Sequence, residues 1–349
     1  MSSNEIIYSE LPTTTEFRQE WATFCESCFS FKPNPPTASY FINHLEYDDA
    51  LRSADGDVPC VLTARSKVSD NIIGSARFVH RLLWINGSFK PVIGVADVCV
   101  SAEWQRKSIA KTLLTMIINK AKERKSTNIF LLHAAETLQP LYSSVGFRSI
   151  DTEWHKLSLS RKCRSIELSI LIDSYLVEEK IIESVSLDQM AALSESLTRQ
   201  CDLSGVLYKS SEYYGSWVRK IPRLTLLSVS TGSDCDHKDQ MIAIIGEYRG
   251  YLLLRDLGVD NIENMHICFA SILRYIQNTH SNISTPIDSP IEIVVPEKLA
   301  RNIVSVCDLF VHSVAYVDKG WMMLTQDMTE LECFYSGSTK FNFWTVDHF

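Results

Sequence analysis

Residues 94–114 read GVADVCVSAEWQRKSIAKTLL and say more about the architecture than any other segment of the chain. The segment opens with an apolar run that ends at Val100 and is typical of a buried strand, and a short basic turn follows. From Ser108 onward, apolar residues recur at 3.6-residue spacing with lysines on the other side, which predicts an amphipathic helix packed on a sheet. The apolar positions of this helix are Ile109, Ala110, Leu113, Leu114, Ile117, Ile118 and Ala121.

The turn between this strand and this helix is a candidate anion site. The first amides of a helix have no intrahelical acceptors and lie at the positive end of the helix dipole, which suits a pyrophosphate. Arg106, Lys107 and Lys111 add positive charge beside it. Every helix has such an end and most hold no ligand, so the geometry alone leaves open whether this one binds anything.

Upstream of this segment, the pattern predicts a helix and then an antiparallel meander. A short strand is expected at 5–8 and a helix at 14–29, in which Cys25 and Cys28 form part of the buried face. Short apolar runs follow, and Asn86-Gly87 between the last two predicts a type I′ hairpin turn. The expected strands are 58–64, 72–79, 82–85 and 89–100.

Downstream, the pattern predicts a strand–helix–strand crossover and then a second half that begins in a similar order. The crossover comprises a strand at 129–133, a helix at 138–144 that ends near Gly146, and a strand from 147. In the second half, a strand at 180–185 and a helix at 187–198 repeat the strand–helix order of the start of the chain. Further strands are expected at 224–229, 241–248, 252–257, 291–295 and 312–317, and helices at 262–277 and 299–306. The fold class is therefore α+β.

Composition narrows the range of functions. A chain of 349 residues has room for about two domains. Its formal charge of −8 argues against nucleic acid as a partner and favours an amine-bearing small molecule or a basic peptide. The sequence contains neither a secretory signal nor an apolar stretch long enough for a membrane span, so we expect a cytoplasmic or nuclear protein with reduced cysteines. No cysteine or histidine spacing indicates a metal site, and none is expected.

Two motifs resemble those of the GNAT superfamily of N-acetyltransferases. Residues 105–110, QRKSIA, resemble the Q/R-x-x-G-x-G/A signature, and residues 140–147, PLYSSVGF, resemble the family's fYeklGF element. The resemblance implies the GNAT fold, a mixed and mostly antiparallel sheet with flanking helices. The second half resembles a degenerate repeat, as in Eis-type enzymes. We therefore expect an acetyl-CoA-binding domain at 1–165 and a GNAT-like domain without a cofactor site at 166–349.

The resemblance also implies a reaction. An acetyl group would move from acetyl-CoA, the cosubstrate, to a primary amine by direct attack. The strand main chain at Val98, Cys99 and Val100 would hold the pantetheine arm, and Tyr142 would protonate the departing thiolate. The pyrophosphate would bind to the amides of Gln105, Arg106, Lys107, Ser108, Ile109 and Ala110.

Some positions depart from the family pattern or leave alternatives open. Ser108 stands where the family prefers glycine, so it either crowds the phosphates or donates a hydrogen bond to them. Some members carry a glutamate base where this chain has Gly94. Phe349, through its terminal carboxylate as in Eis-type enzymes, is the preferred catalytic candidate for the base. Asp97 and His133 are alternatives, although each could instead have a purely structural role. The rival interpretation is a non-catalytic acyl-CoA-binding or protein-interaction module.

Overall fold

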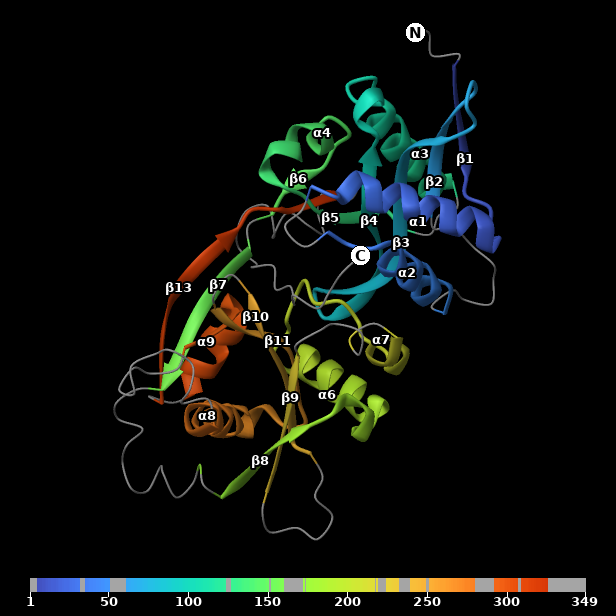
Figure 1. Cartoon of the computed structure of the whole chain (residues 1–349). Helices are drawn as coiled ribbons and strands as arrows, with labels where there is room; N and C mark the ends of the chain where they lie inside the picture. Colours follow the sequence, from blue (N-terminus) through green and yellow to red (C-terminus); the bar gives the residue numbers. More distant parts are fainter. Residues whose placement is uncertain are drawn as a thin grey trace.

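The computed structural model describes most of the chain. Described are residues 5–31, 35–50, 61–123, 127–150, 152–159, 172, 174–216, 218, 224–231, 239–248, 251–279, 292–306 and 309–325. These residues form two seven-stranded sheets with helices on both faces of each (Figure 1). Among the described helices, none is long and apolar enough to span a membrane.

The first sheet contains the apolar strand that precedes the basic turn at 105–108. Its order is β1 (Ile6–Glu10), β2 (Val61–Ser66), β3 (Ile72–Ile85), β4 (Ser88–Val100), β5 (Ile129–His133), β14 (Trp321–Thr325) and β6 (Arg148–Ser149). The pair β4–β5 is parallel and the other pairs are antiparallel. Its helices are α1 (Thr15–Phe29), α2 (Ala38–Ala50), α3 (Ile109–Glu123) and α4 (Gln139–Ser143).

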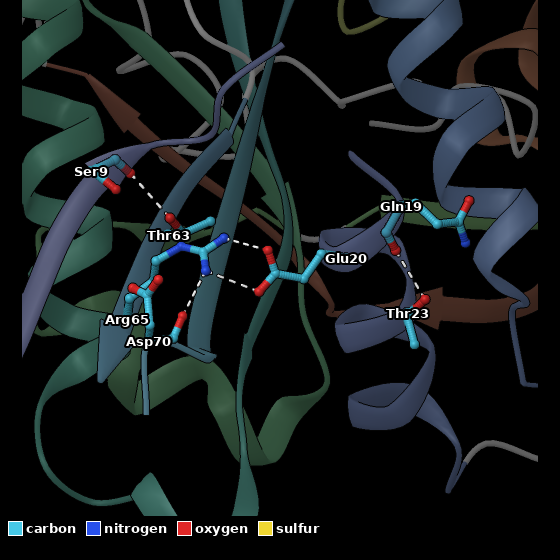
Figure 2. Close-up of polar contacts among 7 residues, drawn as sticks. All are labelled: Ser9, Gln19, Glu20, Thr23, Thr63, Arg65 and Asp70. Atoms are coloured by element: carbon cyan, nitrogen blue, oxygen red, sulfur yellow. Dashed lines mark hydrogen bonds and ion pairs between the residues drawn. The ribbon is translucent and has the colours of Figure 1, made fainter. Parts of the chain in front are cut away.

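The helices cover opposite faces of this sheet because neighbouring strand residues point in opposite directions. Val61 packs with Trp21 of α1 and Phe41 of α2, whereas the adjacent Leu62 packs with Leu113 of α3. Figure 2 shows a polar contact that holds α1 in place: both terminal nitrogens of Arg65 on β2 bond the carboxylate of Glu20, at 2.9 and 2.6 Å.

The second sheet has the same plan. Its order is β8 (Tyr175–Lys180), β9 (Thr225–Thr231), β10 (Met241–Tyr248), β11 (Tyr251–Val259), β12 (Ile293–Pro296), β7 (Thr152–Leu159) and β13 (Phe310–Asp318). Leu226 packs on the side of α6 (Leu187–Gln200) and α7 (Ser211–Ser216). The adjacent Leu227 packs on the side of α8 (Ile262–Thr279) and α9 (Glu297–Val306). The α+β class and the mixed, mostly antiparallel sheets are confirmed.

The two halves exchange one strand each. Strand β14, from the end of the described chain, lies between β5 and β6 of the first sheet, whereas β7 lies between β12 and β13 of the second. In Figure 1 the long strands β7 and β13 run side by side, as their antiparallel pairing requires. Two strands therefore cross the boundary expected at 165/166, and the division into domains remains a prediction.

A second link between the halves lies at the far end of β3. The Trp84 amide donates to the carbonyl of Val206 at 2.9 Å, and the Tyr208 amide donates to the carbonyl of Leu82 at 2.8 Å. The predicted strands 72–79 and 82–85 form one continuous strand, β3. The polar pair His80-Arg81 between them does not interrupt pairing with β4.

Other predictions from the sequence differ in detail. The strand expected at 180–185 lies earlier, at Tyr175–Lys180, and residues Ile182–Ser184 form a 3₁₀ turn. Helix α2 was not expected. The hairpin at Asn86-Gly87 is confirmed, since φ is 48° and 79° at these residues, as a type I′ turn requires. Cys25 is buried, as expected for one face of α1.

Candidate functional site

The candidate site lies where β4 and β5 separate. Among the described residues, the two parallel strands pair only at Ile93–Phe130 and Gly94–Leu131. Beyond Gly94, β4 continues beside β3 alone, and Asp97 has a positive φ of 49° at a register shift between Ser75 and Arg77 of β3. Such a bulge redirects a strand. The last residues of β4 therefore present a main-chain edge that β5 does not cover.

Hydrogen bonding shows which residues face this edge. The Ser101 amide donates to the carbonyl of Ile73 on β3 at 3.0 Å. Backbone groups alternate in direction along a strand, so those of Cys99 also face β3 and those of Val98 and Val100 face the open edge. The Gln105 side-chain amide donates to the Val100 carbonyl at 3.3 Å, which agrees with this direction.

Cys99 therefore lies differently from Val98 and Val100, although the resemblance assigns all three residues to the pantetheine arm. Its thiol is buried on the α1 side of the sheet, with its sulfur 4.0 Å from that of Cys25. The neighbouring Cys25 thiol, and to a smaller degree burial, raises the pKa of Cys99 well above its ordinary value. The structure does not bring either its main chain or its side chain to the open edge.

The basic turn follows directly and is open to solvent. Gln105, Arg106, Lys107 and Ser108 are all exposed, and the Lys107 ammonium lies 4.3 Å from the centre of the Trp104 ring. Arg106 and Ser108 adopt left-handed φ values of 60° and 62°. Alternation of left-handed and ordinary residues turns successive amides toward one side and forms an anion-binding concavity.

The helix begins within this turn. The Thr112 amide donates to the Ser108 carbonyl at 2.9 Å, so Ser108 closes the first turn of α3. Its left-handed φ explains the family's preference for glycine there, because a side chain is strained in this region. The sequence pattern predicts either crowding of the phosphates or a hydrogen bond to them, and this conformational reason is visible only in the backbone.

Packing at Gly74 sets the start of α3 against the sheet. Gly74 pairs with Val100, and a Cβ there would lie 2.7 Å from the side chain of Ile109, the first residue of α3. A side chain at position 74 would push the start of the helix away from β4. The close approach keeps the amides of the turn, including those of Ile109 and Ala110, beside the open edge.

Tyr142 lies on α4 and is 7 % exposed. It packs against Phe147 with the rings 6.2 Å apart and belongs to the core on the α3 side of the sheet. Burial, and to a smaller degree Cys99, raises the pKa of Tyr142 to about 12. The phenol therefore keeps its proton at neutral pH, as an acid must.

His133 lies at the end of β5 on the opposite face. Residues 129, 131 and 133 alternate with Phe130 and Leu132, which face the core that contains Tyr142. The Nε2 atom of His133 lies 3.1 and 3.2 Å from the carboxylate oxygens of Asp318, the last residue of β13. No local sequence pattern indicates this partner, because 185 positions separate the two residues.

The other base candidates are placed as follows. Arg77 is buried and donates to the carboxylate of Asp97 at 2.5 Å, so Asp97 holds the bulge in an ion pair, which favours its structural reading. Gly94 is buried in the paired part of β4. Phe349 lies outside the described residues, and its role remains a prediction.

Comparisons with known proteins agree with this geometry. A family model described as an acetyltransferase (GNAT) domain matches residues 62–158. A search of curated proteins found no match.

Solved structures share the fold at low sequence identity. A GCN5-related N-acetyltransferase from Anabaena variabilis is 14 % identical, with a TM-score of 0.62 over 91 % of this chain and 72 % of that one. Eis1 from Mycobacterium abscessus is 13 % identical, with a TM-score of 0.58 over 93 % and 74 %. Saccharomyces cerevisiae N-myristoyltransferase with bound myristoyl-CoA is 9 % identical, with a TM-score of 0.52 over 93 % and 83 %.

The motif at 105–110 and the element at 140–147 both lie within the matched residues. The chain therefore carries a GNAT acetyltransferase domain at residues 62–158, has the GNAT fold, and is an acyltransferase.

Proposed function

We propose that the chain transfers an acetyl group from acetyl-CoA to a primary amine by direct attack. The observation that carries this proposal is the uncovered edge of β4 beside the exposed turn at 105–108. In this proposal, Val98 and Val100 hold the pantetheine arm through their main chain, and the amides from Gln105 to Ala110 hold the pyrophosphate. Much of the rate then comes from holding the thioester in position.

Two groups on opposite faces of the sheet would handle the protons. The amine nitrogen attacks the thioester carbonyl, the carbon–sulfur bond breaks, and Tyr142 donates its proton to the departing thiolate. The amine must lose a proton, and His133 is our candidate to accept it. Asp318 engages Nε2, so Nδ1 is the nitrogen available for this role. The Phe349 carboxylate is the second candidate for the same step, by resemblance to Eis-type enzymes.

The acceptor is proposed to be an amine-bearing small molecule or a basic peptide, in keeping with the formal charge of −8. We place the reaction in the cytoplasm or nucleus. Five cysteines within the described residues are free thiols, which supports a reducing compartment.

The test is a thiol-release assay with acetyl-CoA and a panel of polyamines, amino acids, aminoglycosides and basic peptides, with calorimetry of CoA binding in parallel. We expect CoA release that depends on one class of amine. Binding of acetyl-CoA without release across the panel would support the rival, a non-catalytic acyl-CoA-binding module. Absence of binding would overturn the proposed cofactor.

The proton acceptor is tested with His133→Gln and Asp318→Asn. Both are expected to lower kcat and shift the ascending limb of its pH profile, with the KM for acetyl-CoA unchanged. An unchanged pH profile in both variants would exclude His133 as the proton acceptor. The Phe349 carboxylate would then be the remaining candidate, and a variant that lacks Phe349 and carries an amidated terminus would test it.

A further inference from the structure

A group of titratable side chains lies in the second half, apart from the proposed transfer site. Glu153 and His155 are two residues apart on β7 and therefore point to the same face of the second sheet. Glu297 is the first residue of α9 and directly follows Pro296, which pairs with Trp154 of β7. The end of β12 thus brings Glu297 next to the two side chains of the exchanged strand.

The three side chains are close enough to share one ion. One ligand atom of each lies within 4.8 Å of those of the other two. The Nε2 atom of His155 is 2.9 Å from a carboxylate oxygen of Glu153, and one oxygen of Glu297 accepts a bond from Arg301 at 2.5 Å. A fourth group, His312 on β13, stacks on His155 with ring centroids 5.4 Å apart.

Two of the three ligands are buried and Glu153 is partly buried, which makes their charges costly. His155 is 4 % exposed and Glu297 is 3 % exposed, whereas His312 is exposed and leaves a route from solvent. The Nδ1 atom of His155 is buried and has no hydrogen-bond partner within the described residues. Two carboxylates close together in such a place repel each other, and a cation between them would offset that repulsion.

We propose that Glu153, His155 and Glu297 bind one divalent transition-metal ion, with zinc as the best match. Zinc takes imidazole nitrogen and carboxylate oxygen at about 2.0–2.2 Å, so the ligand atoms need only small side-chain rotations to converge. His312 or a water completes four ligands. The imidazole disfavours calcium and magnesium, which prefer oxygen ligands alone. Spacing could not predict this site, because its ligands come from separate segments.

The ion would fasten the exchanged strand β7 to α9. Metal binding to the folded chain alone adds to its stability, so saturating zinc should raise the unfolding midpoint. The site does not depend on acetyl transfer, and its metal can be measured without any activity assay.

The test uses the full chain, stripped with EDTA and dialysed, then titrated with zinc by calorimetry with a competing chelator. We expect one equivalent to bind at this site, with affinity about tenfold weaker or more in His155→Gln and Glu297→Gln. Two variants serve as matched controls and should bind like the parent chain. Glu292→Gln removes an exposed charge that pairs with Lys156 of β7, the strand that carries Glu153 and His155. His80→Gln removes an exposed histidine of the first sheet.

Cobalt substitution of the parent chain tests the ligand set without any variant that could fail to fold. A cobalt spectrum with nitrogen and oxygen ligands and no thiolate charge-transfer band supports the proposal. A thiolate band would place the metal on cysteines and overturn the proposal. The same conclusion would follow if His155→Gln bound zinc as tightly as the parent chain, or if the parent chain bound no zinc.

Discussion

The helix that follows the diverging strand differs between the two halves. Both sheets let a parallel pair separate after two paired positions, β4–β5 in the first and β11–β12 in the second. At α3 the turn is basic, and no acidic residue lies in the first turn of the helix. At α8 the Ile262 amide donates to the Gln200 side chain at 3.0 Å, and the Glu263 amide donates to the Asn261 side chain at 2.9 Å.

The two helix starts differ although the strands before them diverge in the same way. Strand divergence is common to both halves, so it does not by itself make a cofactor site. What differs is whether the amides at the helix start are already satisfied and which charge surrounds them. Glu263 in the first turn of α8 would repel a phosphate. We therefore expect one CoA site per chain, at α3.

Loss of the acid should have the largest effect. Tyr142→Phe should lower turnover about 100-fold, because general acid catalysis contributes at least about this factor, while CoA affinity stays the same. Tyr175→Phe removes the same atom from β8 of the second half and should leave turnover unchanged. A Tyr142→Phe variant with parental turnover would refute the acid assignment.

The pH dependence sharpens this prediction. Burial raises the pKa of Tyr142 to about 12, so its phenol stays protonated well above the ordinary pKa of about 10. Turnover should not decline between pH 8 and 10 through this group. A descending limb centred near pH 10 that is absent from Tyr142→Phe would show that the phenol is not shielded as described.

Charge reversal in the α3 turn should have the next largest effect. Arg106→Glu should weaken CoA binding about 10- to 100-fold, since one hydrogen bond to a charged group contributes about 1.5–3 kcal/mol. Lys122→Glu, in the last turn of the same helix, makes the same change in charge far from the turn and should bind CoA normally. If the turn held no phosphate, calorimetry would show the same CoA affinity in Arg106→Glu as in Lys122→Glu.

Ser108 offers a smaller test of backbone conformation. Ser108→Gly should stabilise the chain by about 1 kcal/mol, because glycine tolerates the left-handed φ of 62° that strains a serine. Ser108→Ala keeps the strain and removes only the hydroxyl. If the hydroxyl donates to a phosphate, both variants bind CoA more weakly; if it crowds the ligand, the glycine variant binds more tightly. A higher thermal unfolding midpoint for Ser108→Ala than for Ser108→Gly would show that the left-handed φ does not strain a side chain at this position.

The smallest effect is expected at α8. Gln200→Ala removes the acceptor of the Ile262 amide and should cost about 0.5–1 kcal/mol of stability, with CoA stoichiometry still one per chain. Gln200→Glu keeps an acceptor for the Ile262 amide and should therefore lose less stability than Gln200→Ala. A second equivalent of CoA in the alanine variant would show that side-chain capping alone closes the second site.

Local patterns predicted local structure well. The strands at 129–133 and 241–248 and the helix from 262 begin and end within two residues of their predicted limits, because periodicity and turn residues act over short distances. Val98, Val100 and the turn at 105–110 lie together because they are neighbours in the chain. The pairing of β14 with β5, the contact of Asp318 with His133 and the Glu297 cluster join distant segments, and no periodic pattern encodes such pairings.

The exchange of β14 has a consequence for how the chain matures during synthesis. The first sheet cannot join β6 to β5 through β14 until the ribosome has released residues 321–325. Pairings of such long sequence separation form slowly, and the nascent first half carries an unfilled strand position meanwhile. Since Tyr142 lies in the segment between β5 and β6, the surroundings of this proposed acid are complete only after residues 321–325 have joined the sheet.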